Sequence, residues 1–193
     1  MSPVALPDFT LERELLRDFP LIIACDEVGR GALAGPVWVG ATMVDATSGA
    51  FPEGLRDSKL VSELKRPALA ERAATWAHHS SVGWASAAEV DSEGIIRALG
   101  LAAVLAIADL ASQGVDVGAA LVILDGSHDY ISREWAGTIA VRPVVKADRD
   151  CASAAAAPCA WPAWRWPRRP WARGQGGAAM CRRCCCCWPS APC

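Results

Sequence analysis

Acidic side chains follow two apolar segments that have the character of neighbouring strands. "LIIACDE" at 21–27 ends in Asp26 and Glu27, and "AALVILDG" at 119–126 reaches Asp125. Ends of adjacent parallel strands meet in the crevice where α/β proteins usually bind ligands. Carboxylates gathered there repel one another unless a cation neutralises them, and oxygen ligands without His or Cys favour Mg²⁺ or Mn²⁺ over zinc. The sequence therefore indicates a divalent-metal site, although a lone Asp at a strand end is more often a solvated loop residue.

A glycine-rich string, "DEVGRGALAGPV" at 26–37, begins with this acid pair. Glycine permits positive φ and lets a ligand approach the backbone closely. Exposed N–H groups and the cation of Arg30 could therefore hold a phosphodiester against a metal site. A tight turn with a surface arginine is the alternative for any single Gly-x-Gly, and it is less common for the whole string.

The elements that would position these residues alternate between strand-like and helix-like runs. A helix is expected after Ser62, and a long buried helix after Asp91 or Ser92 that ends near Gly114. The second strand follows the first closely enough to pair with it antiparallel. This order predicts an α/β domain with a mixed sheet. The expected strands occupy 21–27, 37–44, the first half of 81–90, 119–126 and 137–148.

Taken together, these strings resemble the ribonuclease HII family, the type 2 ribonucleases H. The resemblance covers roughly residues 20–153 and implies a ribonuclease H-like mixed sheet flanked by helices. It implies cleavage of the RNA strand of RNA–DNA hybrids, or at ribonucleotides embedded in duplex DNA, with Mn²⁺ or Mg²⁺. The strings that carry it are "DEVGRGALAGPV", "DSK" at 57–59, "ASAAEVDSEGII" at 85–96, "LDGSHD" at 124–129, and "VKAD" at 145–148 leading into "CAS".

The resemblance also implies roles for single residues. Members of the family cut by two-metal hydrolysis that leaves 3′-hydroxyl and 5′-phosphate ends. A backbone without side chains can approach the 2′-OH, the group that distinguishes RNA from DNA. For each lysine a solvated surface charge is the alternative. The implied metal ligands are Asp26, Glu27 and Asp125, the loop that senses the 2′-OH is Gly29, Arg30 and Gly31, and the phosphate contacts are Lys59 and Lys146.

The composition of the chain changes abruptly near residue 150. Residues 1–150 hold 13 Lys and Arg against 21 Asp and Glu, a net charge of −8, whereas residues 151–193 hold six Arg and no acid. From about Ala154 no apolar period of 2 or 3.6 is present. In the family, "CAS" leads into an alanine-rich helix start and a Lys-Val-x-Arg-Asp segment, to which the resemblance assigns a fourth metal-site aspartate. Its absence makes the activity doubtful and suggests that a frameshift replaced the C-terminal fifth.

Other interpretations of this tail and of the whole chain remain open. Cys181 and Cys184 have Cys-x-x-Cys spacing, but a structural zinc site needs a second pair some distance away. "WPAWRWPRRPWARG" has the composition of a basic, aromatic nucleic-acid arm. A chain that has lost its last ligand could be a non-catalytic or misfolded remnant that binds metal or hybrid weakly. A different metal-dependent nuclease or phosphotransferase on the same sheet is a further alternative.

The organisation expected from the sequence has three parts. An N-terminal extension covers 1–19, a ribonuclease H-like catalytic domain covers 20–153, and an aberrant low-order tail covers 154–193. The C-terminal helical part of the fold is therefore expected to be missing or disordered. One Cys in the first 150 residues suggests a reducing compartment, and neither a signal peptide nor a membrane span is evident. We expect a cytoplasmic protein that is a monomer and does not bind membranes.

Overall fold

The computed structural model describes residues 6–31, 35–57 and 60–160. Residues 159 and 160 are described by their backbone alone. Lys59, the cysteine pair at 181 and 184 and the basic aromatic segment after 160 lie outside the described residues. So does the C-terminal helical part that we expected to be missing or disordered.

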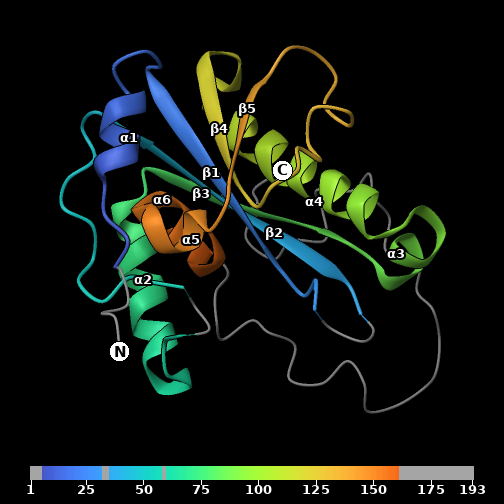
Figure 1. The fold of residues 1–193 in the computed structure, drawn as a ribbon, viewed down its shortest axis with the longest axis horizontal. Helices are drawn as coiled ribbons and strands as arrows, with labels where there is room; N and C mark the ends of the chain where they lie inside the picture. The colour runs from blue at the N-terminus through green and yellow to red at the C-terminus, as the bar shows by residue number, and fades with distance from the viewer. Residues whose placement is uncertain (1–5, 32–34, 58–59, 161–193) are drawn as a thin grey trace.

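A five-stranded mixed sheet forms the centre of the described chain (Figure 1). Its strand order is β3-β2-β1-β4-β5. Neighbours β1 and β2, and β2 and β3, are antiparallel, whereas β4 is parallel to both β1 and β5. The mixed α/β sheet expected from the sequence is thus confirmed, including the antiparallel first pair. The strands are β1 (Leu21–Val28), β2 (Val37–Asp45), β3 (His79–Ala85), β4 (Ala120–Asp125) and β5 (Ala140–Val144).

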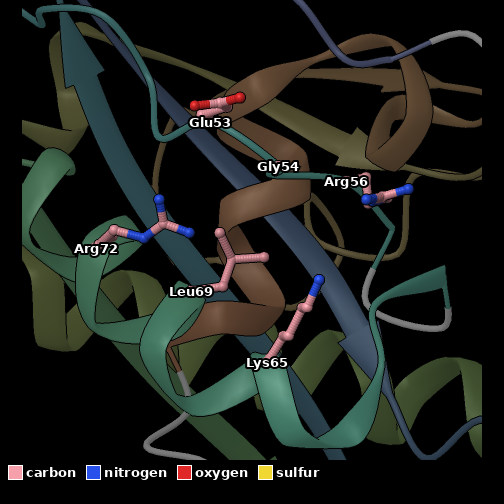
Figure 2. A pocket seen from close by; sticks show the side chains of 6 residues that line it. All are labelled: Glu53, Gly54, Arg56, Lys65, Leu69 and Arg72. Carbon is pink, nitrogen blue, oxygen red and sulfur yellow. The ribbon is translucent and has the colours of Figure 1, made fainter.

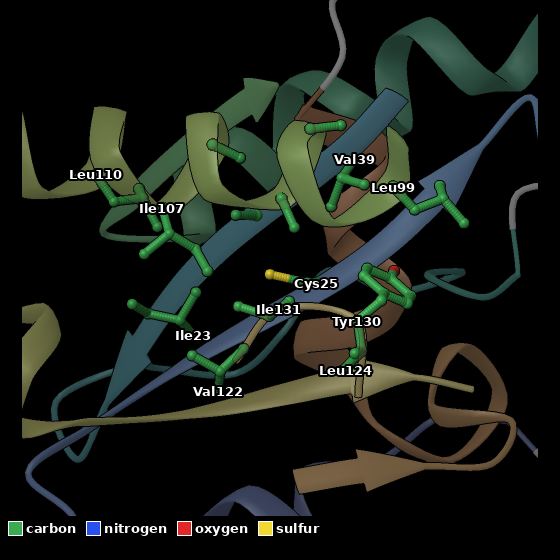
Figure 3. Close-up of a cluster of buried hydrophobic side chains, with 14 of the residues drawn as sticks. Ile23, Cys25, Val39, Leu99, Ile107, Leu110, Val122, Leu124, Tyr130 and Ile131 are labelled. Atoms are coloured by element: carbon green, nitrogen blue, oxygen red, sulfur yellow. The ribbon is translucent and has the colours of Figure 1, made fainter. Parts of the chain in front are cut away.

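One face of the sheet is covered by α4 (Ile95–Ser112), the long apolar helix expected from the sequence. Leu99 and Ile107 of α4 pack against Ile23 and Val122 of the central strands (Figure 3). The helix lies so close to β3 that a Cβ built on Gly83 would fall 1.9 Å from the Ala102 carbonyl oxygen. A side chain there would therefore force the helix away from the sheet.

The start of this helical region differs from the sequence-based expectation. A separate helix, α3 (Ala87–Glu93), begins at Ser86, whose hydroxyl accepts from the Glu89 N–H while the Glu89 carboxylate accepts from the Ser86 N–H. This reciprocal capping box satisfies backbone donors that would otherwise be unpaired. Gly94 then adopts a φ of 80° and separates α3 from α4. The expected cap at Asp91 or Ser92 was wrong because those residues already belong to α3.

Within the described residues, α4 is also the one helix long and apolar enough to cross a membrane by length and composition. This is weak support for a membrane span, because the central helix of a packed core passes the same test. Eight residues of α4 are buried in the protein. We therefore treat it as a core helix.

The opposite face of the sheet is covered by several shorter helices (Figure 1). Phe9, Leu15 and Leu69 bring apolar side chains from α1 and α2 onto Ile22 and Ile123 of the sheet. These helices form one layer with α5 and α6, and short 3-10 turns occupy Glu63–Lys65, Val117–Ala119 and Ala157–Ala160. The α-helices of the layer are α1 (Thr10–Leu15), α2 (Arg66–Trp76), α5 (Ala147–Asp150) and α6 (Ala152–Ala156).

The packed chain continues past Ser153, where the sequence led us to expect the tail to begin. Residues 154–157 are fully buried, and the first three of them belong to the apolar cluster that contains Phe9, Ile22 and Ile123. A Cβ built on Gly40 of β2 would fall 2.0 Å from the Ala157 carbonyl oxygen, so the backbone at 157 lies directly on the sheet. An alanine run shows no apolar periodicity, yet its small side chains permit this close approach.

The N-terminal segment also belongs to the packed layer. Asp8 forms an isolated parallel bridge with Cys151, and the Ala152 N–H donates to the Asp8 carbonyl at 2.8 Å. Phe9 and Leu15 are buried against the sheet. Residues 8–15, which we expected to be an extension, therefore form part of the core together with α6.

Candidate metal centre

The register between β1 and β4 places two of the acids side by side. Cys25 of β1 is the parallel partner of Leu124 in β4. Asp26 and Asp125 are the next residues of these two adjacent strands, so they lie side by side. Both strands are central and their residues before the acids are buried. The apolar runs thus fix the strands in the core and leave the acids at the carboxyl edge of the parallel pair.

Three carboxyl groups converge at this edge. One oxygen from each of Asp26, Glu27 and Asp125 can be chosen so that all three lie within 4.8 Å of one another. Asp26 is buried, and the other two are partly buried. Within the described part of the chain, Oε2 of Glu27 is buried and has no hydrogen-bond partner. The cluster therefore has an acceptor that is turned away from water and still lacks a donor or a cation.

The electrostatics of the cluster are unfavourable without a cation. Burial, followed by the negative charges of Asp125, Glu27 and Asp148 in that order, raises the pKa of Asp26 to about 8. A hydrogen bond from the Glu27 N–H to Asp26 Oδ1, at 2.7 Å, acts in the opposite direction. Like charges held together away from water disfavour ionisation, and a nearby cation reverses this effect.

Asp148 is a fourth acid at this site that the sequence analysis did not assign. It lies in α5, is buried, and is one of the charges that act on Asp26. Asp148 is therefore our candidate for the fourth carboxylate, which we expected to be absent. The signal was present in "VKAD", which carried the family resemblance, but we placed the fourth acid in a later segment. Its position depends on the turn between β5 and α5, which strand periodicity does not predict.

The turn that leads into α5 is tied directly to the cluster. The Ala147 N–H donates to Asp125 Oδ1 at 2.6 Å. Lys146, immediately before it, has a φ of 63° and is the one described non-glycine residue with positive φ. Such a conformation costs roughly 1–2 kcal/mol for an L-residue. The backbone strain at Lys146 accompanies a geometry that orients Asp125 and brings Asp148 to the cluster.

The glycine-rich loop adjoins the cluster at the end of β1. Gly29 has a φ of 99°, and a Cβ on it would fall 2.9 Å from the Pro36 carbonyl oxygen. Arg30 Nη1 lies 3.2 Å from Glu27 Oε1 and its side chain is about half exposed. Gly31 has open space around its Cβ position and is exposed. The fold thus requires glycine at 29, whereas the backbone at 31 is open to a ligand.

The remaining site candidates are not members of the carboxylate cluster or lie outside the described chain. Lys146 is exposed at the start of α5, next to Ala147. His128 is exposed and its ring nitrogen lies 2.7 Å from Ser127 Oγ. Lys59 has no described position.

The residues present fit a hard divalent cation. The donors are carboxylate oxygens, the ligand type that Mg²⁺ and Mn²⁺ accept, and His or Cys is absent from the described cluster. The partnerless Oε2 of Glu27 and the mutual repulsion at Asp26 are the features that a bound cation would relieve. Divalent metal binding is therefore the chemistry this edge of the sheet supports.

The fold and the carboxylate cluster define a ribonuclease H-like protein, with acids at the edge of a mixed sheet covered by helices on both faces. The family model described as Ribonuclease HII matches residues 23–160, and the chain belongs to that family. The Ribonuclease HII of Streptomyces avermitilis is 41% identical over 157 residues, which cover 80% of this chain and 63% of the relative. That of Paracoccus denitrificans is 41% identical over 155 residues, covering 78% and 67%. The chain thus spans somewhat under two thirds of its Streptomyces relative.

Solved structures agree on the fold. The ribonuclease H2 of Pyrococcus horikoshii OT3 superposes with a TM-score of 0.52 at 19% identity, covering 75% of this chain and 72% of that one. Bst-RNase HIII in complex with Mn²⁺ superposes with a TM-score of 0.55 at 22% identity, covering 72% and 50%. The expected ribonuclease H-like sheet is confirmed by both.

Proposed function

We propose that this protein is an endonuclease that hydrolyses the RNA strand of RNA–DNA hybrids and cuts at ribonucleotides embedded in duplex DNA. The observation that carries the proposal is the convergence of Asp26, Glu27 and Asp125 within 4.8 Å at the edge of a ribonuclease H-like sheet. Family membership over residues 23–160 supports the same reaction. We expect a monomer in the cytoplasm that acts without a membrane.

In this proposal Asp26, Glu27, Asp125 and Asp148 hold Mn²⁺ or Mg²⁺. When bound, two such ions lower the pKa of a coordinated water and stabilise the leaving 3′-oxygen. The protein supplies a fixed set of acceptors, since Asp125 is held by the Ala147 N–H and Asp26 by the Glu27 N–H. The products would carry 3′-hydroxyl and 5′-phosphate ends.

The loop after β1 would select the ribonucleotide. Gly29, Arg30 and Gly31 begin two residues after Glu27, at the end of β1, so a strand bound at the cluster would pass close to their backbone. The open space at Gly31 would admit the sugar, and the 2′-OH can both donate to and accept from a backbone group. Lys59 and Lys146 would contact phosphates of the same strand.

The test is cleavage of a DNA duplex that contains a single ribonucleotide, in Mn²⁺ and in Mg²⁺. We expect cutting at the ribonucleotide and its loss in Asp26→Asn, while Asp18→Asn, an exposed acid after α1, serves as the control. Cleavage that Asp26→Asn leaves unchanged would reject the site. A chain that binds metal but does not cut this duplex would instead support the non-catalytic alternative.

We also propose that the catalytic domain ends near Pro158 and that the segment after it derives from another reading frame. The family match ends at residue 160, and the chain contains no Asp or Glu after residue 150. Re-sequencing the DNA across codons 150–165 tests this. An intact gene whose alternative frames encode no Lys-Val-x-Arg-Asp segment would contradict it.

A further inference from the structure

Positive side chains converge on a groove between α2 and the segment that precedes it. The groove has a volume of about 280 Å³ and is lined by Glu53, Gly54, Arg56, Lys65, Leu69 and Arg72. Lys65, which caps the start of α2, and Leu69 and Arg72 of α2 are spaced four and three residues apart, so they share one side of the helix. Figure 2 shows Lys65 and Arg72 pointing toward the 53–56 segment.

The cations of the groove are not neutralised by the protein. Among the described residues, Arg56, Lys65 and Arg72 make no ion pair within 4.0 Å, and all three are exposed. Glu53 is the single acid of the lining, so the groove carries a net charge of +2. The surrounding chain is acidic, with a net charge of −8 over residues 1–150. A local positive groove on an acidic body therefore calls for an anionic ligand.

The shape of the groove favours an extended anion over a small enclosed one. Its floor is the buried side chain of Leu69, and its cations stand on two different segments around that floor. Figure 2 shows Arg56, Lys65 and Arg72 at separate places around Leu69, so they form no cage around a single ion. Duplex nucleic acid presents a row of phosphates, with one negative charge per ~1.7 Å of axis, that can meet several such cations at once.

The groove lies on the side of the sheet that also carries one of the site acids. Leu69 of α2 belongs to the same buried cluster as Ala147, the residue that precedes Asp148 in α5. Arg56 is followed directly by the buried Asp57 and the "DSK" string. A duplex held at the carboxylate cluster could therefore extend across this layer of helices.

We propose that this groove binds the sugar–phosphate backbone of the substrate duplex, away from the bond that is cut. The inference rests on the proposed function, because it takes the same duplex as ligand. The groove contributes affinity that does not depend on base sequence and that falls as salt rises. The positive groove locally offsets the electrostatic repulsion between the negatively charged protein and the negatively charged duplex.

The test measures binding of the full chain to a fluorescently labelled RNA–DNA hybrid, with EDTA present so that no strand is cut, over a series of salt concentrations. Lys65→Ala and Arg72→Ala should each weaken binding about threefold to tenfold and reduce the slope of log affinity against log salt by about one. Arg17→Ala, which removes an exposed arginine at the end of α1, is the matched control and should change neither quantity. The charge-conserving variant Lys65→Arg should keep the affinity and thereby separates charge loss from misfolding.

Two outcomes would overturn the proposal. Groove variants whose affinity and salt slope equal those of Arg17→Ala would show that the duplex does not use this surface. Variants that lose binding of inorganic phosphate, measured by calorimetry, while keeping duplex binding would show a small-anion site only. The proposed function fails separately, since it requires cleavage that Asp26→Asn abolishes, whereas the groove concerns binding without metal.

Discussion

Glu12 and Ser153 are joined by two hydrogen bonds in the buried layer between α1 and α6. Glu12 Oε1 accepts from the Ser153 N–H at 2.8 Å and from the Ser153 hydroxyl at 2.7 Å. Both residues are fully buried, and among the described residues Oε2 of Glu12 has no partner. These bonds connect residues 141 positions apart and hold the N-terminal segment to the last described helices.

Ser153→Ala should destabilise the fold because it removes the hydroxyl donor from a buried carboxyl group. The expected loss is about 1–3 kcal/mol in the free energy of unfolding, the usual cost of leaving a buried polar group with fewer partners. Urea unfolding followed by circular dichroism measures it. Ser132→Ala, at an exposed turn, removes a hydroxyl of the same type and should cost less. Equal losses in the two variants would show that the buried Ser153 hydroxyl contributes no more to the free energy of unfolding than an exposed hydroxyl does.

The burial of Glu12 should also make stability depend on pH. Burial raises the pKa of Glu12 above its ordinary value of 4.5, partly offset by the Ser153 hydrogen bonds. At pH values between 4.5 and the raised pKa, Glu12 holds more protons in the folded protein than in the unfolded chain. The free energy of unfolding therefore falls as pH rises through this range. Glu12→Gln is neutral throughout and should lose that slope, gaining stability relative to the parent between acid and neutral pH. A difference between the two chains that is constant from pH 4 to 8 would contradict this.

Truncation should distinguish the two possible ends of the packed domain. A chain stopped after Ser153 loses four buried alanines, at about 0.8 kcal/mol for each methyl group, and uncovers the sheet around Gly40. We therefore expect a lower thermal midpoint for that chain than for the full one, although the sequence led us to expect a low-order tail from residue 154. A chain stopped after Ala160 should keep the midpoint of the full chain. If both truncations melt alike, the contact between residue 157 and β2 does not stabilise the fold.

Asp148→Asn should reduce cleavage strongly, because it removes a buried carboxylate from the cluster. A loss of metal stabilisation worth several kcal/mol corresponds to roughly 10²- to 10³-fold in rate. Asp150→Asn is the matched control, since Asp150 is an exposed acid of the same short helix. A second readout is the rise in thermal midpoint on adding Mn²⁺, which Asp148→Asn should diminish. Equal activity and equal Mn²⁺ response in the two variants would exclude Asp148 from the site.

Alanine substitutions at Gly29 and Gly31 should have different consequences. Gly29→Ala places a side chain at a φ of 99° and 2.9 Å from the Pro36 carbonyl oxygen, so it should lower stability by more than about 1 kcal/mol. Gly31→Ala meets no atom of the described residues within 4 Å and should leave the thermal midpoint unchanged. If the backbone at 31 approaches the ribose, this variant should nevertheless cut a ribonucleotide-containing duplex more slowly. Unchanged cleavage by Gly31→Ala would exclude that close approach.

Much of the sheet could be predicted because its information is local. The apolar runs that end in Asp26 and Asp125 identify central strands, and their parallel pairing then brings the acids together. The loop glycines and the long helix α4 are equally evident from residue type and period.

The parts that sequence did not predict depend on contacts between distant segments or on single turns. The break at Gly94 divides a helical region that reads as continuous. Asp148 lies in a short helix that begins after a positive φ at Lys146, a turn that residue type does not reveal. Residues 154–157 are buried, and residue 157 lies directly on β2. A run of alanines has no pattern of apolar and polar residues from which the buried side could be predicted.

The close packing of residue 157 against Gly40 has a consequence for how the chain is made. A ribosome releases β1 and β2 long before it releases α6, and that side of the sheet has no cover from 152–157 until those residues emerge. Until then the apolar side chains of Ile22, Val44 and Ile123 are covered only in part, by α1 and α2, and can contact other nascent chains. Synthesis that stalls or shifts frame just before codon 152 would release a sheet with one incompletely covered side, whereas an error ten codons later would release a closed core.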